Sequence, residues 1–129
     1  MNPKWLLPLA VVLHNTEEAI WLPGFRARHG WHSITPFEFR MGTAIVALLA
    51  IAVTLATLRH GRSRFASWCY YAFCWIMLLN VFWHAGVAIY VRAYAPGLLT
   101  AVAFVLPVTL YLIIRGSKGN TAPAPGAST

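Results

Sequence analysis

Two adjacent glutamates, Glu17 and Glu18, follow His14 by three and four residues inside the first hydrophobic segment of the chain. The whole protein has only three acidic residues, so most of them stand where lipid is expected. Side chains three and four residues apart share one face of a helix, which places these three together. Because ionisable groups inside a membrane span are costly, such a cluster is a functional hypothesis by default.

A second pair of polar residues, Asn80 and His84, lies in the hydrophobic segment 66–91. These residues are four apart and also share a helix face. In a bundle of four spans, the first and third helices run in the same direction. The first cluster then lies about 14–20 Å along its helix and the second about 21–27 Å along its own. We therefore predict that the two sets meet.

One chemistry that fits these residues is metal binding. His-x-x-Glu-Glu resembles the zinc motif His-x-x-Glu-His, in which the first and last residues bind the metal. His14, Glu18 and His84 would then be the ligands of a zinc-like divalent ion. Glu17 would activate water for hydrolysis, and Asn80 would orient a ligand or substrate.

A second chemistry needs no metal. Two adjacent carboxylates in a dry pocket repel each other, so one of them should keep its proton. A neutral Glu beside a His is an acid–base pair, as an isomerase would use. The same residues would also suit a proton relay in a small coupled transporter. They would equally suit a polar network that only fixes helix packing in an accessory membrane protein.

The composition indicates an integral membrane protein. The chain has 129 residues, 59% of them hydrophobic and 10% charged, and its mean hydropathy is +0.62. Apolar runs of this length are typical of transmembrane helices, and we predict four of them, at 5–22, 37–58, 66–91 and 97–114. The predicted fold is an all-α, integral membrane four-helix bundle formed by residues 1–115. The Pro- and Gly-rich segment 116–129 is predicted to be a disordered tail.

Local signals set the ends of the first two helices. Pro23-Gly24 is predicted to end the first helix. Thr35, Pro36 and Glu38 match an N-cap, a first helical residue and a capping box, so Glu38 is assigned a structural role.

The net charge of +7 does not indicate nucleic-acid binding. The basic residues stand singly at helix ends and in loops, as expected for charges that flank a membrane. Six belong to the side with both termini (Lys4, Arg59, Arg62, Arg64, Arg115, Lys118) and four to the other (Arg26, Arg28, Arg40, Arg92). The excess of basic residues on the side of the two termini predicts that both termini lie in the cytoplasm, with the protein in a plasma or inner membrane. The partners expected are the lipid bilayer and a lipophilic small molecule; the oligomeric state is not predicted.

Aromatic residues near the polar cluster are candidates for contacts with such a molecule. Trp21 continues the stripe of His14 and Glu18, and Trp83 precedes His84. Tyr94 stands before a Pro-Gly helix start. Most Trp and Tyr residues of a membrane protein serve as packing and interface groups, which is the alternative for all three.

Three motifs of this chain resemble those of the HXXEE family of small integral membrane proteins. They are the run His14-Asn15-Thr16-Glu17-Glu18, the Asn-x-x-x-His spacing of Asn80 and His84, and Tyr94-Ala95-Pro96-Gly97. The resemblance implies a membrane protein whose polar motif looks like an active site, but it supplies no reaction. The chain is also similar, more distantly, to four-helix sterol isomerases that use intramembrane His and Glu, a likeness of architecture and residue type alone.

Overall fold

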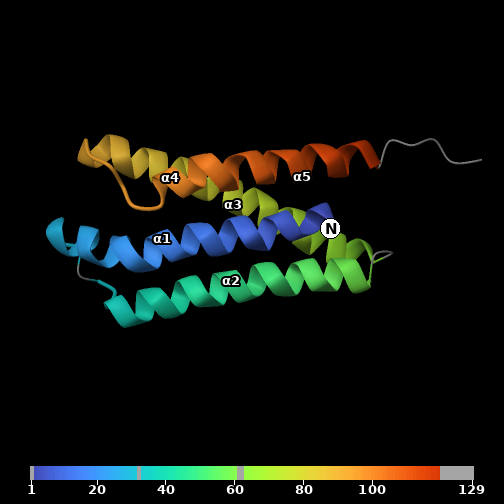
Figure 1. The fold of residues 1–129 in the computed structure, drawn as a ribbon, viewed down its shortest axis with the longest axis horizontal. Coiled ribbons are helices and arrows are strands. Elements are labelled where there is room, and N and C mark those ends of the chain that lie inside the picture. Colours follow the sequence, from blue (N-terminus) through green and yellow to red (C-terminus); the bar gives the residue numbers. More distant parts are fainter. Residues whose placement is uncertain (1, 32, 61–62, 120–129) are drawn as a thin grey trace, which may run out of the picture.

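Four antiparallel helical stretches form the protein, and Figure 1 shows them side by side. The computed structural model describes residues 2–31, 33–60 and 63–119, with the backbone alone at 117–119. The helices are η1 (Pro3–Trp5) with α1 (Leu6–Arg28), then α2 (Pro36–Arg59), α3 (Arg64–Val91) and a fourth stretch of α4 (Leu98–Thr100), η2 (Ala101–Val105) and α5 (Leu106–Gly119). The described residues contain no strand. The predicted all-α four-helix bundle is confirmed.

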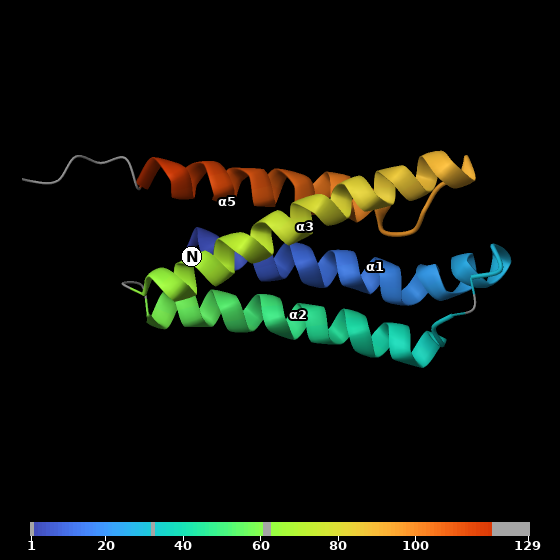
Figure 2. The ribbon, with the colours of Figure 1, turned by 180° about the vertical axis from the view of Figure 1, so that it is seen from behind.

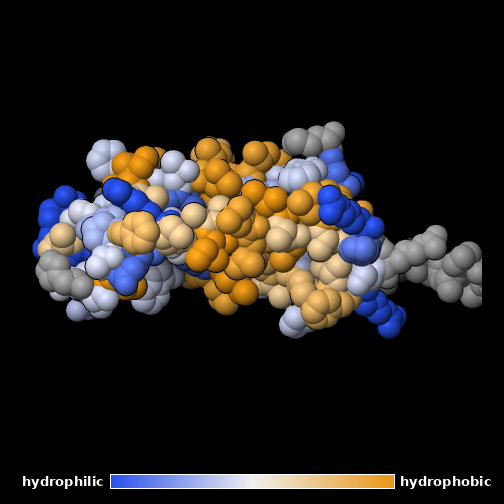
Figure 3. All heavy atoms as spheres, turned by 90° about the horizontal axis from the view of Figure 1, so that it is seen from below, coloured by the Kyte–Doolittle hydropathy of each residue, from blue (hydrophilic) through white to orange (hydrophobic). Residues whose placement is uncertain are grey.

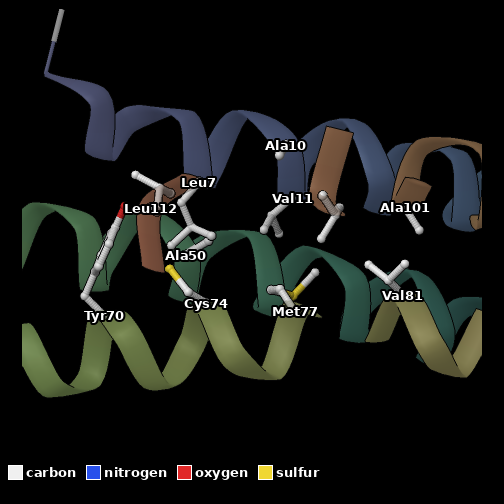
Figure 4. Packing of buried hydrophobic residues seen from close by; sticks show 11 residues of the cluster. Leu7, Ala10, Val11, Ala50, Tyr70, Cys74, Met77, Val81, Ala101 and Leu112 are labelled. Carbon is white, nitrogen blue, oxygen red and sulfur yellow. The ribbon is translucent and has the colours of Figure 1, made fainter. Parts of the chain in front are cut away.

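The hydrophobic core occupies one end of the bundle. Leu7 and Val11 of α1 pack with Tyr70, Cys74 and other buried residues of all four stretches (Figure 4). Three of the helical stretches contribute an alanine to the core (Ala10, Ala50, Ala101). Such small residues let membrane helices approach each other closely. α3 lies beside α2 where it begins and diverges towards α4 where it ends (Figure 2). The core thus lies before His14 along α1 and leaves the diverging end for polar groups.

Three of the four helical stretches are long and apolar enough to cross a membrane. They are Pro36–Arg59, Arg64–Val91 and Leu98–Gly116. Figure 3 shows a hydrophobic middle on one face of the molecule, with hydrophilic residues towards both ends. Large apolar side chains of α2 and α3, such as Leu48 and Leu79, are exposed, as expected for a surface that faces lipid. α1 is not among these three helices, so its assignment as a fourth span remains a prediction.

The predicted end of the first helix at Pro23-Gly24 is wrong. α1 continues through Pro23 to Arg28, and Phe25 is buried. Proline has a helical φ but no N–H, so it cannot bond the carbonyl four residues earlier. That carbonyl belongs to Ala19, and it accepts a hydrogen bond of 3.3 Å from Arg40 Nε of α2. An arginine of the neighbouring helix thus replaces the donor that Pro23 lacks.

This compensation predicts a non-additive pair of substitutions. Arg40→Met keeps the apolar stem but removes the donor, which should lower the free energy of unfolding by about 1 kcal/mol. In a Pro23→Ala background the new N–H of residue 23 reaches the Ala19 carbonyl, so the cost of Arg40→Met should fall towards zero. Thermal unfolding in detergent, followed by circular dichroism, measures the four variants of the cycle. An equal cost in both backgrounds would show that Arg40 acts elsewhere.

The predicted start of α2 is confirmed. Thr35 is the N-cap, Pro36 is the first helical residue, and Glu38 completes a capping box. The backbone N–H of Thr35 donates to Glu38 Oε2 at 2.8 Å, and that of Glu38 donates to Thr35 Oγ1 at 3.2 Å. The third acidic residue of the chain is therefore a helix cap.

The fourth stretch differs from the single helix expected at 97–114. Residues Ala101–Val105 form a π-helical turn immediately after Thr100. Pro107 follows this turn and cannot donate to the Ala103 carbonyl, which disfavours regular α-helical bonding here. The stretch then continues to Gly119, so 116–119 are helical where a tail was expected. The rest of the predicted tail, 120–129, lies outside the described residues.

Candidate functional site

His14, Glu18 and His84 lie together between α1 and α3. The two imidazoles are buried and pack edge to face, with ring centroids 4.9 Å apart and planes at 88°. Glu18 Oε1 lies 2.9 Å from His84 Nε2 and 3.8 Å from His14 Nε2. One potential ligand atom from each residue lies within 4.8 Å of the other two. The predicted meeting of the two polar sets is confirmed.

The hydrogen bonds of His14 indicate which of its nitrogens carries the proton. Thr100 Oγ1 donates to Glu17 Oε2 at 2.6 Å, so it accepts from His14 Nδ1–H at 3.1 Å. Asn80 Nδ2 lies 2.8 Å from His14 Nε2 and is placed to donate to it. This tautomer is assigned from the network rather than from a visible hydrogen. In this tautomer Nε2 of His14 carries no proton, and its lone pair accepts the hydrogen bond from Asn80.

Glu17 is bound to the segment that begins the fourth helical stretch. Its Oε1 accepts from the Tyr94 hydroxyl and from the Gly97 N–H at 3.0 Å. Its Oε2 accepts from the N–H and the hydroxyl of Thr100, at 3.1 and 2.6 Å. Both carboxylate oxygens of Glu17 therefore engage this segment instead of the His14–Glu18–His84 cluster.

Tyr94 and Gly97 show why this segment needs these residue types. Partial burial raises the pKa of the Tyr94 phenol above its ordinary value, and the hydrogen bond to Glu17 raises it further. The phenol is therefore protonated at neutral pH and donates its hydrogen bond. Gly97 has φ of 91°, a left-handed conformation that side chains disfavour. A Cβ at Gly97 would lie 2.5 Å from His84 Cε1 and 3.1 Å from Glu18 Cγ. The backbone is thus packed directly against the cluster.

His84 Nε2 is a buried nitrogen without a hydrogen-bond partner among the described residues. It lies 2.9 Å from Glu18 Oε1, but the direction of the ring nitrogen does not satisfy hydrogen-bond geometry. The contact is therefore a close approach of the two groups without a strong hydrogen bond, since hydrogen bonds weaken steeply when misaligned. A tetrahedral ion with ligand bonds of about 2.0–2.2 Å separates its ligand atoms by about 3.3 Å. The 2.9 and 3.8 Å separations from Glu18 Oε1 lie on either side of that value.

A cavity of about 380 Å³ reaches the cluster from between α1, α2 and α3. Glu18 and Asn80 line it together with three other polar residues (Asn15, Glu38, Thr43), and the rest of the wall is apolar, including Phe39, Val46 and Met77. An apolar pocket that ends in a few polar groups is typical of a small-molecule site.

The three aromatic candidates do not line this cavity. Trp21 is 64% exposed on α1, and Trp83 is exposed on α3 beside a different pocket. Tyr94 bonds Glu17, as described above. Their predicted role in binding a substrate remains a prediction.

Sequence reasoning missed Thr100 and the backbone N–H of Gly97 as partners of the motif. The Thr100 hydroxyl hydrogen-bonds both His14 and Glu17 and so links the two. A usable signal existed, because it is one of only two threonines in the apolar segment 97–114. Asn15 was also missed as a polar link between helices: its Nδ2 donates to the Thr43 carbonyl at 2.7 Å.

These features define a helical membrane protein with a buried His/Glu cluster held between two of its helices. The chain belongs to the family described as proteins of unknown function with an HXXEE motif, whose profile matches residues 5–112. It is similar to the uncharacterized protein YrkK of Bacillus subtilis (strain 168), with 33% identity over 109 residues. That alignment covers 82% of this chain and 69% of the relative. No solved structure matches the chain.

Proposed function

We propose that this protein is a membrane-embedded enzyme that hydrolyses a lipophilic small molecule with the help of a divalent metal ion. The observation that carries the proposal is the convergence of His14, Glu18 and His84, in which His84 Nε2 lies beside Glu18 without an aligned hydrogen bond. A buried polar atom without a partner costs free energy, and a cation would satisfy it. Two imidazoles and one carboxylate are also the ligand set of hydrolytic zinc sites.

The residues fit an ion in two further respects. His14 donates Nδ1–H to Thr100, which fixes the ring and leaves Nε2 unprotonated, as in the usual support of a metal-binding histidine. The glycine at position 97 leaves room for His84 and Glu18 to face each other. When bound, a divalent cation would supply a Lewis acid that polarises a carbonyl or phosphoryl oxygen.

The other predicted residues act around this set. Glu17 holds Thr100 and Gly97, so we assign it a positioning role in place of the predicted general base. Asn80 lies 2.8 Å from the nitrogen of His14 that would bind the ion, so its amide must move away on binding. The amide also lines the cavity and can then donate to a substrate oxygen.

The route to the site favours a substrate that arrives from the bilayer. The cavity is lined by residues of α1, α2 and α3, and about half of them are apolar. Both of these helices are long and apolar enough to span the membrane. With α1 as a fourth span and both termini in the cytoplasm, the cluster lies in the extracytoplasmic half of a plasma or inner membrane.

A metal-free enzyme is the second candidate. The contact between Asn80 and His14 Nε2 favours it, because this bond occupies a nitrogen that the metal would need. Glu18 beside His84 would then be the acid–base pair of an isomerase.

Isotope labelling separates these functions even though the substrate is unidentified. Purified protein in nanodiscs is incubated with a bacterial lipid extract, in water enriched with either ¹⁸O or deuterium, and the products are followed by mass spectrometry. Hydrolysis places ¹⁸O in a product, and a chelator should abolish the labelling. An isomerase would place deuterium on carbon without ¹⁸O, and a carrier or a structural subunit would place neither. Either of these last two patterns would contradict the proposal.

Two glycine substitutions provide matched controls for this experiment. Gly42 lines the cavity, and a Cβ there would meet nothing within 4 Å, so Gly42→Leu should fill the cavity and abolish labelling without touching the cluster. Gly86 is equally unobstructed but lines the separate pocket beside Trp83. Gly86→Leu should leave labelling unchanged.

A further inference from the structure

A second and larger pocket lies at the diverging end of the bundle. Its volume is about 750 Å³, and it is formed by the end of α1, the segment after it and the second half of α3. The wall is mainly aromatic and apolar, with Trp31, Phe82, Trp83 and Tyr90 among its residues. It shares no lining residue with the cavity that reaches Glu18. The function proposed above does not use it.

Arg26 supplies the only formal charge among the lining residues of this pocket. Its Nε donates to the Trp31 carbonyl at 3.4 Å and its Nη2 to Ser33 Oγ at 3.2 Å. Within the part of the chain that the structure describes, no carboxylate forms an ion pair with Arg26. A guanidinium has five N–H donors, so these two bonds leave donors free for an anion.

We propose that this pocket binds a single-chain lipid carboxylate, with its head group on Arg26 and its alkyl chain against the aromatic wall. The planar fork of arginine matches a carboxylate and can bind it with two hydrogen bonds. One cationic residue balances one negative charge. The volume lies within the range of about 300–1,000 Å³ that holds small ligands, which favours one chain over a two-chain phospholipid. The position also fits, because Arg26 and Tyr90 lie near helix ends, where a head group meets the membrane surface.

Tryptophan quenching tests the proposal directly. A dibrominated stearate quenches tryptophans that it contacts, and Trp31 and Trp83 line the pocket. The protein is titrated with this probe in neutral detergent, in parallel with the matching dibrominated alcohol and a brominated phosphatidylglycerol. We expect the carboxylate to bind at least tenfold more tightly than either of the other probes. Trp83→Phe should remove much of the quenching signal.

Two substitutions assign the charge and the chain separately. Arg26→Gln should reduce the preference for carboxylate over alcohol to about onefold, and Arg28→Gln, an exposed neighbour outside the pocket, should keep it. Gly86→Leu fills the pocket without touching Arg26, so it should weaken both single-chain probes, and Gly42→Leu should weaken neither. The proposal is overturned if acid and alcohol bind equally, if phosphatidylglycerol binds most tightly, or if Gly86→Leu has no effect. None of these readouts depends on a metal or on hydrolysis.

Discussion

Replacing Gly97 by alanine is expected to push His84 and Glu18 apart and to lower the free energy of unfolding by about 2–4 kcal/mol. Two costs add at this position. The backbone has φ of 91°, which an L side chain disfavours. The new Cβ would also lie 2.5 Å from His84 Cε1 and 3.0 Å from its Nδ1, closer than real Cβ contacts allow. His84 must therefore move, and any ion that it holds should be lost.

Gly30→Ala is the matched control for this substitution. Gly30 also has a positive φ, 72°, but a Cβ there would meet nothing within 4 Å. It should therefore cost only the backbone strain, about 1 kcal/mol, and leave zinc affinity unchanged. Thermal unfolding and zinc titration in detergent measure both variants. Equal losses of stability and unchanged zinc affinity in the two would contradict the packing of Gly97 against the cluster.

Glu17→Gln is expected to cost about 2–4 kcal/mol of unfolding free energy, although it changes only one atom of the side chain. Glu17 accepts four hydrogen bonds from three residues: Tyr94, Gly97 and Thr100. An amide has one acceptor oxygen, and its NH₂ would face two of these donors. The released Thr100 would no longer fix the His14 ring. Loss of such support typically lowers metal affinity by about 10–100-fold.

Glu38→Gln is the control for the loss of a carboxylate. Glu38 caps α2 at an exposed position and lines the cavity, but it is not one of the three residues whose ligand atoms converge. Its replacement should lower the free energy of unfolding far less than Glu17→Gln does, and should leave zinc affinity unchanged. If Glu17→Gln behaves like Glu38→Gln in both measurements, the positioning role assigned to Glu17 is incorrect.

Much of the fold follows from local sequence patterns. Apolar runs located the helices, and Thr35, Pro36 and Glu38 located the start of α2, because a cap depends on neighbours in the chain. The passage of α1 through Pro23 could not be predicted in this way. It depends on Arg40, which is distant in sequence and reaches the Ala19 carbonyl only once the helices have packed.

The same distinction applies to the site. Helical spacing and depth were enough to bring His14 and Glu18 to His84, since four-residue spacing fixes a face. The sequence could not predict that Glu17 would bond the segment before the fourth stretch while Glu18 lies beside His84. Adjacent residues on a helix point about 100° apart, and the placement of Tyr94, Gly97 and Thr100 decides which of them bonds this segment. Trp21 was expected to share the polar face but is exposed, because side chains at the edge of a stripe can face lipid.

Metal content tests the central claim most directly. Purified protein in nanodiscs is equilibrated with zinc, dialysed, and analysed for metal by mass spectrometry, alongside His14→Gln, Glu18→Gln and His84→Gln. Circular dichroism confirms that each variant remains helical. We expect one tightly held ion per chain in the unmodified protein and its loss in all three variants, with Gly86→Leu retaining it. Absence of a bound ion in the unmodified protein, or equal retention in folded variants, would contradict a metal site formed by His14, Glu18 and His84.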